Sequence, residues 1–155
     1  MQNNGVAANY GLTRGDHSLP TDQANVELIR RLNEVVNERR YDDMDALFAP
    51  SFVDHNPAWS VRDLAELKGI LAVAHAALAF TSHHDLIYPA ADGKVVIHIT
   101  FTGQHVKEFL GQPPTGRVVS WTSIEVYRIE DRRIVERWVQ ADTAGLMAQL
   151  GVPLP

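Results

Sequence analysis

The chain has 155 residues, of which 45% are hydrophobic and 21% are charged, a composition that indicates one soluble globular domain with a hydrophobic core. Nineteen acidic against fourteen basic residues give a net charge of -5, which argues against nucleic-acid binding and against a basic membrane-binding patch. Cysteine is absent, so disulfides, thiolate nucleophiles and cysteine-ligated metal ions are excluded.

The N-terminal residues differ in character from the rest of the chain. Residues 1–20 lack hydrophobic periodicity and predict a flexible arm ahead of one domain over residues 21–155. They have neither the charged start nor the apolar centre of a signal peptide. The most apolar stretch, residues 70–80, is too short to cross a bilayer, so a cytoplasmic location is expected.

Three helices are predicted in the first half of the chain. Between residues 21 and 36, hydrophobic residues recur every three or four positions, as in an amphipathic helix. A short helix over residues 42–48 ends before Pro50, because proline disfavours helix in the residue that precedes it. A third helix begins near Ser60 and carries an apolar stripe as far as Leu78.

The second half changes to runs of β-branched and aromatic residues, which are typical of strands. Helices followed by strands indicate an α+β fold, in which helices cover one face of an antiparallel sheet and leave a cavity between the layers. The predicted strands span residues 82–88, 95–102, 118–129 and 134–141, and a last helix spans residues 142–150.

Three segments carry a resemblance to a known family: LFAPSFVDHNP at 47–57, GQHVKEFLGQPPTGR at 103–117, and IVERW with DTAGLMAQLG within 134–151. In this order and spacing they resemble the SnoaL-like polyketide cyclases, or ester cyclases, of the nuclear-transport-factor-2-like superfamily. The resemblance covers residues 22–152. It implies a cone of N-terminal helices packed on a curved, mostly antiparallel sheet that encloses a pocket, with no cofactor and no metal ion.

The chain departs from the family pattern at two positions. Lys107 stands where many relatives have glycine, at the rim of the expected pocket. The final hairpin reads Asp131-Arg132-Arg133, where relatives usually have Asp-Gly-Lys. A tight turn would therefore force Arg132 into a positive φ, which is strained for a residue other than glycine; the alternative is a wider turn.

The chemistry that the resemblance implies is an intramolecular aldol condensation that closes a ring. This reaction needs a base to remove a C–H proton and a donor to stabilise the developing enolate or alkoxide. The resemblance places the acid/base role on Asp142, at the end of the last predicted strand. Asp142 is equally well placed to cap the C-terminal helix, and one residue can fill both roles.

Two histidines are candidate partners of Asp142. His105 follows a β-branched strand and could polarise a substrate carbonyl or shuttle the proton. His55 lies in a predicted loop between helices, from which it could reach the same cavity. The alternatives are structural, a hydrogen-bonded strand end for His105 and a loop contact for His55.

The same resemblance and the alternation of strand side chains supply candidate pocket walls. Alternate residues of a strand share a face, so Trp138 and Gln140 are predicted on the face of Asp142. The complete set of predicted substrate-binding residues is Trp138, Phe52, Trp121, Phe109 and Gln140.

Other chemistries are less well supported. His83 and His84 are adjacent on a strand and point to opposite faces, so they cannot readily share a metal ion. Ser120 and Ser123 lie in a strand without a nucleophile elbow, which argues against serine hydrolysis.

We therefore expect a cofactor-free cyclase or isomerase that acts on a polyketide-like or related hydrophobic carbonyl compound. The alternatives are a non-catalytic protein that binds a small apolar ligand, a dehydratase, and an epoxide hydrolase. The last would need an Asp-Arg-Asp trio around a water, and the sequence identifies none. Apolar residues on both faces of strand 118–129 further predict a homodimer or homotetramer, because a partner should cover the outer face.

Overall fold

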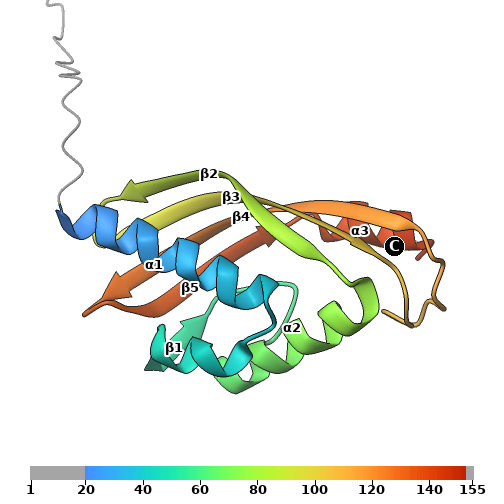
Figure 1. Ribbon diagram of the computed structural model, residues 1–155, viewed down its shortest axis with the longest axis horizontal. Helices are drawn as coiled ribbons and strands as arrows, with labels where there is room; N and C mark the ends of the chain where they lie inside the picture. The colour runs from blue at the N-terminus through green and yellow to red at the C-terminus, as the bar shows by residue number, and fades with distance from the viewer. Residues whose placement is uncertain (1–19, 153–155) are drawn as a thin grey trace, which may run out of the picture.

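A curved five-stranded sheet and the helices on its concave side make up the computed structural model, which describes residues 20–152 (Figure 1). The predicted arm therefore lies outside the described residues, apart from Pro20. The elements are α1 (Pro20–Asn37), a 3-10 helix η1 (Tyr41–Ala46), β1 (Phe48–Asp54), α2 (Leu64–Leu78), β2 (Thr81–Ala90), β3 (Lys94–Gln104), β4 (Val118–Glu130), β5 (Arg133–Ala141) and α3 (Thr143–Leu150).

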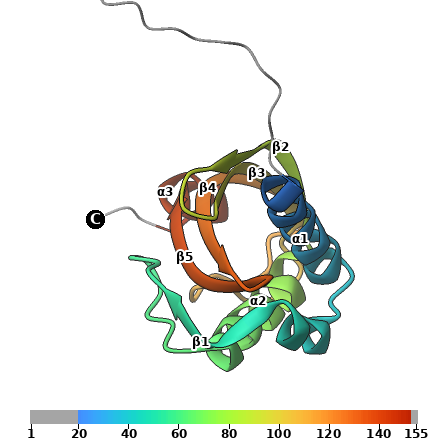
Figure 2. The same ribbon diagram turned by 90° about the vertical axis from the view of Figure 1, so that its left-hand side faces the viewer.

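The strands lie in the order β1-β5-β4-β3-β2, and β2 to β5 form an antiparallel meander. Strand β1 alone runs parallel to its neighbour, β5. Figure 2 shows how the sheet curls, with α1 and α2 on its inner side. The predicted α+β architecture with a mostly antiparallel sheet is confirmed, and the curvature creates the space in which a ligand site can form.

The segment after α1 differs from its prediction. The expected helix over residues 42–48 is a 3-10 helix that ends at Ala46, and the chain then enters β1. Phe48 and Phe52 of this strand are buried and meet edge to face, with ring centroids 4.7 Å apart. Helix α2 begins at Leu64 and not near Ser60.

The boundaries of α2 have clear local causes. Asp63 caps the helix, because its carboxylate accepts a hydrogen bond from the Glu66 backbone N–H. Ala79 ends it in the left-handed conformation, and β2 follows at once. No helix within residues 20–152 is long and apolar enough to cross a membrane.

Two hydrophobic clusters hold the helices against the sheet. The first joins α1 to the inner face of β3, where alternate residues from Val95 to Ile99 are buried. The second packs α3 and the end of α2 around Phe80 and Val119. None of the helices described within residues 20–152 covers the outer face of the sheet, which exposes Leu86, Tyr88 and Ile124.

The hairpin between β4 and β5 confirms the expected backbone strain. Asp131 and Arg132 have φ angles of 47° and 61°. Two successive positive angles are the geometry of a two-residue hairpin turn that matches the twist of its strands. The close return of β5 onto β4 therefore holds Arg132 in a conformation usually left to glycine, asparagine or aspartate.

Candidate functional site

A large cavity of about 460 Å³ lies between α2 and the inner face of the sheet. Its size falls in the usual range for small-molecule sites. Phe101 and Trp121 stack on its wall with ring centroids 5.0 Å apart and planes 6° from parallel. The aromatic residues that line it are Trp59, Phe80, Phe101, Phe109 and Trp121.

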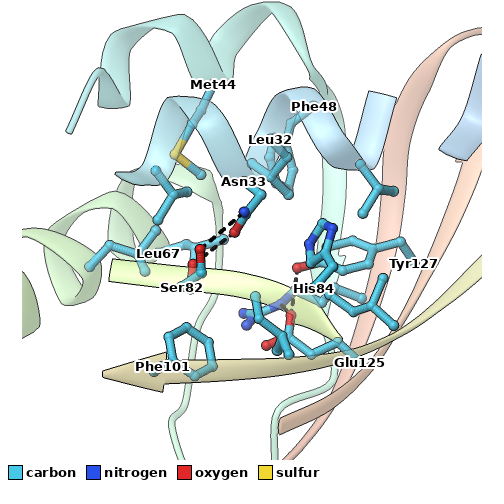
Figure 3. A pocket seen from close by; sticks show the side chains of 16 residues that line it. Leu32, Asn33, Met44, Phe48, Leu67, Ser82, His84, Phe101, Glu125 and Tyr127 are labelled. Carbon is cyan, nitrogen blue, oxygen red and sulfur yellow. Dashed lines mark hydrogen bonds and ion pairs between the residues drawn. The ribbon is translucent and has the colours of Figure 1, made fainter. Parts of the chain in front are cut away.

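A second, smaller cavity of about 60 Å³ lies between α1 and the same face of the sheet (Figure 3). Helix α1 and η1 contribute mostly apolar side chains, with Asn33 of α1 bonded to Ser82 of β2, and β2 and β4 contribute the other polar side chains. Five residues line both cavities, so the two spaces are adjacent: Leu67, Leu71, Phe101, Glu125 and Arg137.

A buried arginine between two carboxylates occupies this boundary. The Arg137 Nη1 donates to Asp54 Oδ2 at 2.9 Å, and its Nε donates to Glu125 Oε2 at 3.1 Å. The side chains of Asp54, Glu125 and Arg137 are 0%, 4% and 13% exposed. The Tyr127 hydroxyl adds a hydrogen bond of 2.5 Å to Glu125 Oε2.

The electrostatics of this cluster favour an ionised Glu125. Burial by itself would raise the pKa of the Glu125 carboxyl, but the charge of Arg137 and hydrogen bonds from Arg137, Tyr127 and Ser123 lower it below the usual value. Burial and the neighbouring Glu125 raise the pKa of Tyr127, which therefore keeps its proton. Burial opposes the charge of Arg137, yet its carboxylate partners raise its pKa.

Two hydrogen bonds anchor the Glu125 carboxylate through one of its oxygens. The bonds from Tyr127 and Arg137 both end on Oε2 and fix the orientation of the carboxylate. Neither of these two bonds involves Oε1, and Glu125 lines both cavities. A carboxylate anchored by one oxygen and free at the other can act as a general base.

Asp142 lies away from this cluster. It is exposed and caps α3, with its Oδ1 accepting a hydrogen bond of 2.8 Å from the Gly145 N–H. It is not among the residues that line the large cavity, although its neighbours Ala141 and Thr143 are. The geometry thus accounts for Asp142 as a helix cap, and its catalytic role stays a prediction.

His105 is fully buried and holds the loop that follows β3. Its Nδ1 accepts hydrogen bonds from the Thr115 N–H and hydroxyl, while its Nε2 has no partner within residues 20–152. The backbone N–H of His105 donates to Arg117. Gly103 is needed just before it, since a Cβ there would lie 2.2 Å from the Leu78 carbonyl oxygen. His105 is not among the residues that line either cavity.

His55 lies beside the end of β1, on the opposite face of the sheet. Its ring stacks on Trp138 at 4.8 Å, and its Nε2 lies 3.3 Å from Glu136. The expectation that Trp138 and Gln140 face the pocket is corrected, because the β5 residues lining the large cavity are Arg137, Val139 and Ala141.

Trp138 and Gln140 do share the face of Asp142, but that face is not the one that lines the cavity. A β-bulge lies earlier in β5. The pairing of β4 with β5 steps from Arg128↔Glu136 to Ile129↔Ile134, so Val135 is an extra residue. Ile134 and Val139 are consequently both buried, although simple alternation would put them on opposite faces.

The three remaining predicted walls divide between cavity and core. Trp121 and Phe109 line the large cavity. Phe52 packs in the core beside Phe48 and is not among the lining residues. Within residues 20–152, no three histidine, aspartate or glutamate side chains are grouped so that they could hold a metal ion.

Glu125, Arg137 and Asp54 were not predicted from the sequence as site residues, although the pattern of β4 contains a signal for Glu125. Alternation along β4 places Glu125 on the same face as Val119 and Tyr127, so a charged side chain occupies a position on the mostly apolar face of the strand. A buried charge must be paired, and this makes such a position a candidate site.

Comparison with known proteins places the chain in a family. The family model for SnoaL-like polyketide cyclase matches residues 26–150. The protein belongs to the SnoaL-like polyketide cyclases, which confirms the resemblance seen in its motifs.

Individual relatives agree with this assignment. The chain is 30% identical over 142 residues to the aklanonic acid methyl ester cyclase DnrD of Streptomyces peucetius, covering 84% of this chain and 92% of that one. It is 31% identical to IdmH of Streptomyces antibioticus, with a TM-score of 0.73 over 83% of this chain and 99% of that one. TsrD of Streptomyces laurentii is 28% identical, with a TM-score of 0.75 over 85% and 98% of the two chains.

Proposed function

We propose that the protein is a cofactor-free cyclase that closes a ring by an intramolecular aldol-type reaction on a polyketide-like carbonyl compound, with Glu125 as the general base. The carrying observation is the Glu125 side chain, which Arg137 and Tyr127 fix in the wall of a mostly apolar cavity. The relatives named as aklanonic acid methyl ester cyclases support the reaction class.

The proposed step begins with the substrate in the large cavity. Glu125 Oε1 takes a proton from a carbon beside a carbonyl group, and the C–H electron pair forms the new C–C bond to a second carbonyl carbon. The π electrons of that carbonyl move to its oxygen, which receives the proton back from Glu125. A carboxylate suffices because a C–H group between two carbonyls, common in polyketides, is acidic.

Asp142 remains the rival base, so the test compares two variants on aklanonic acid methyl ester. Glu125→Gln keeps the size of the side chain and an acceptor for Tyr127 but removes the base. We expect it to lower turnover by about 10²–10⁴. Asp142→Asn keeps an effective helix cap and tests the other assignment. Melting temperatures show that both variants are folded.

Ring closure leaves the mass of the substrate unchanged. Chromatography therefore separates the product from the substrate, and mass detection shows that the two are isomers. Loss of turnover in Asp142→Asn together with full turnover in Glu125→Gln would overturn the role of Glu125. Saturable binding without any turnover by the wild-type protein would instead support a non-catalytic ligand-binding protein.

Epoxide hydrolysis is the second candidate, and the Asp54–Arg137–Glu125 trio favours it. Two carboxylates joined through one arginine form the kind of constellation that can hold and activate a water molecule. In this reaction Glu125 would take a proton from water while the resulting hydroxyl attacks an epoxide carbon; the C–O bond of the ring breaks, and the opened oxygen receives the proton from Glu125. The product would gain the mass of one water, so the same assay with an apolar epoxide separates the two functions.

A further inference from the structure

The small cavity beside Glu125 has the shape of a subsite. Its volume of about 60 Å³ corresponds to roughly two water molecules, or to a group of two or three non-hydrogen atoms. It shares lining residues with the large cavity, Glu125 and Arg137 among them, so the two spaces adjoin. Leu32, Val36 and Met44 form its apolar wall.

His84 places an imidazole ring in the lining of the small cavity. It lies on β2 opposite Ile99 and faces inward, whereas the adjacent His83 faces out toward Asp85. Figure 3 shows His84 and Tyr127 together on one side of this cavity. Burial and nearby charges are the main causes of the lowered pKa of the His84 ring.

The surrounding charges select the kind of group that can enter. Burial lowers the pKa of His84; Arg30 and His83 lower it further, whereas Glu125 and Asp85 oppose them. The imidazole is therefore neutral at neutral pH and can donate a hydrogen bond without presenting a charge. An anionic group would meet the Glu125 carboxylate, and a cationic group would compete with Arg137 for it.

We propose that the small cavity is a subsite for a short, neutral carbonyl-bearing arm of the substrate, such as an acetyl group, with His84 as the hydrogen-bond donor to its oxygen. The apolar wall on α1 takes the alkyl part of the arm, and β2 provides the donor. The body of the ligand stays among the aromatic rings of the large cavity.

The catalytic role of this subsite rests on the proposed function, whereas binding of the arm does not. If Glu125 removes the proton beside the carbonyl group of this arm, negative charge develops on the carbonyl oxygen. His84 would then donate a hydrogen bond to that oxygen. Binding of the arm can be measured without turnover, so the subsite and the reaction can fail separately.

The test compares two probes, 2-acetylanthraquinone and 2-isopropylanthraquinone, whose side groups match in size and differ in the carbonyl oxygen. Quenching of the fluorescence of Trp59 and Trp121, which line the large cavity, reports binding. We expect the wild-type protein to bind the acetyl probe about three- to tenfold more tightly, the effect of one neutral hydrogen bond.

Two variants and a control locate the effect. His84→Leu should abolish the preference for the acetyl probe, and Val36→Phe, which fills the cavity from α1, should weaken both probes. His98→Leu changes a histidine on the neighbouring strand that is bonded to Asp85 on the outer face, and it should preserve the preference. Equal binding of both probes by the wild type, or a preference that survives in His84→Leu, would overturn the proposal.

Discussion

A buried histidine on α2 makes the stability of this protein depend on pH. His75 is 3% exposed and stacks on Phe80, with ring centroids 3.8 Å apart. Its Nδ1 is bonded to the Tyr41 hydroxyl, and its Nε2 has no partner within residues 20–152. Burial, helped by the charge of Arg39, lowers the pKa of His75 from 6.5 to about 4.

The direction of the effect follows from proton binding. Below pH 6.5 the unfolded chain takes up a proton at His75, whereas the folded protein resists it until about pH 4. The contribution of the neutral His75 to the free energy of unfolding is complete above pH 6.5 and is lost as the pH falls toward 4. Each pKa unit corresponds to about 1.36 kcal/mol, so the whole shift amounts to about 3 kcal/mol, of which about 2 kcal/mol is lost by pH 5.

Urea denaturation at pH 7 and pH 5 of the wild type and of His75→Phe measures this contribution. The variant keeps the ring stack on Phe80 but has no titrating group at this position. Between pH 7 and pH 5 we therefore expect its free energy of unfolding to fall by about 2 kcal/mol less than that of the wild type. Carboxylates titrate in both proteins and cancel in the difference. Tyr41→Phe keeps the imidazole and should retain the wild-type slope. Equal losses in the wild type and His75→Phe would refute this reasoning.

Three further expectations concern the site, the outer face and the last helix. Arg137→Met leaves Asp54 and Glu125 unpaired, so it should destabilise the protein by about 3–5 kcal/mol in urea titrations at pH 7. The loss of stability caused by Arg137→Met should be smaller at pH 4, where the unpaired carboxylates take up protons. We propose that a second copy of the chain covers the outer face around Ile124, which is 54% exposed. Light scattering should therefore show a dimer or tetramer that Ile124→Lys dissociates, and a monomeric wild type would contradict it. Asp142→Ala should lower the free energy of unfolding by about 1 kcal/mol, and an unchanged midpoint would argue against the cap.

Local sequence pattern determined most of the elements of this protein. The spacing of apolar residues predicted α1 nearly to its ends, and runs of β-branched residues predicted β3, β4 and β5. The glycine that relatives usually have at the position of Arg132 indicated a positive φ there if the turn was tight, and the two-residue turn does impose that angle on Arg132. These features depend on neighbours in the chain, which are visible in the sequence.

The composition of the site depends on contacts between residues that lie far apart in the sequence. Strand β1 forms because β5, about eighty residues later in the chain, pairs with it from Phe48↔Ile134 onward. The bulge at Val135 determines that Arg137, and not Trp138, faces the cavity, since one extra residue exchanges the two faces of a strand. Asp54, Glu125 and Arg137 come from three strands, and no local pattern encodes their meeting. Their pairing follows from the physical requirement that charges enclosed by the same core must neutralise one another.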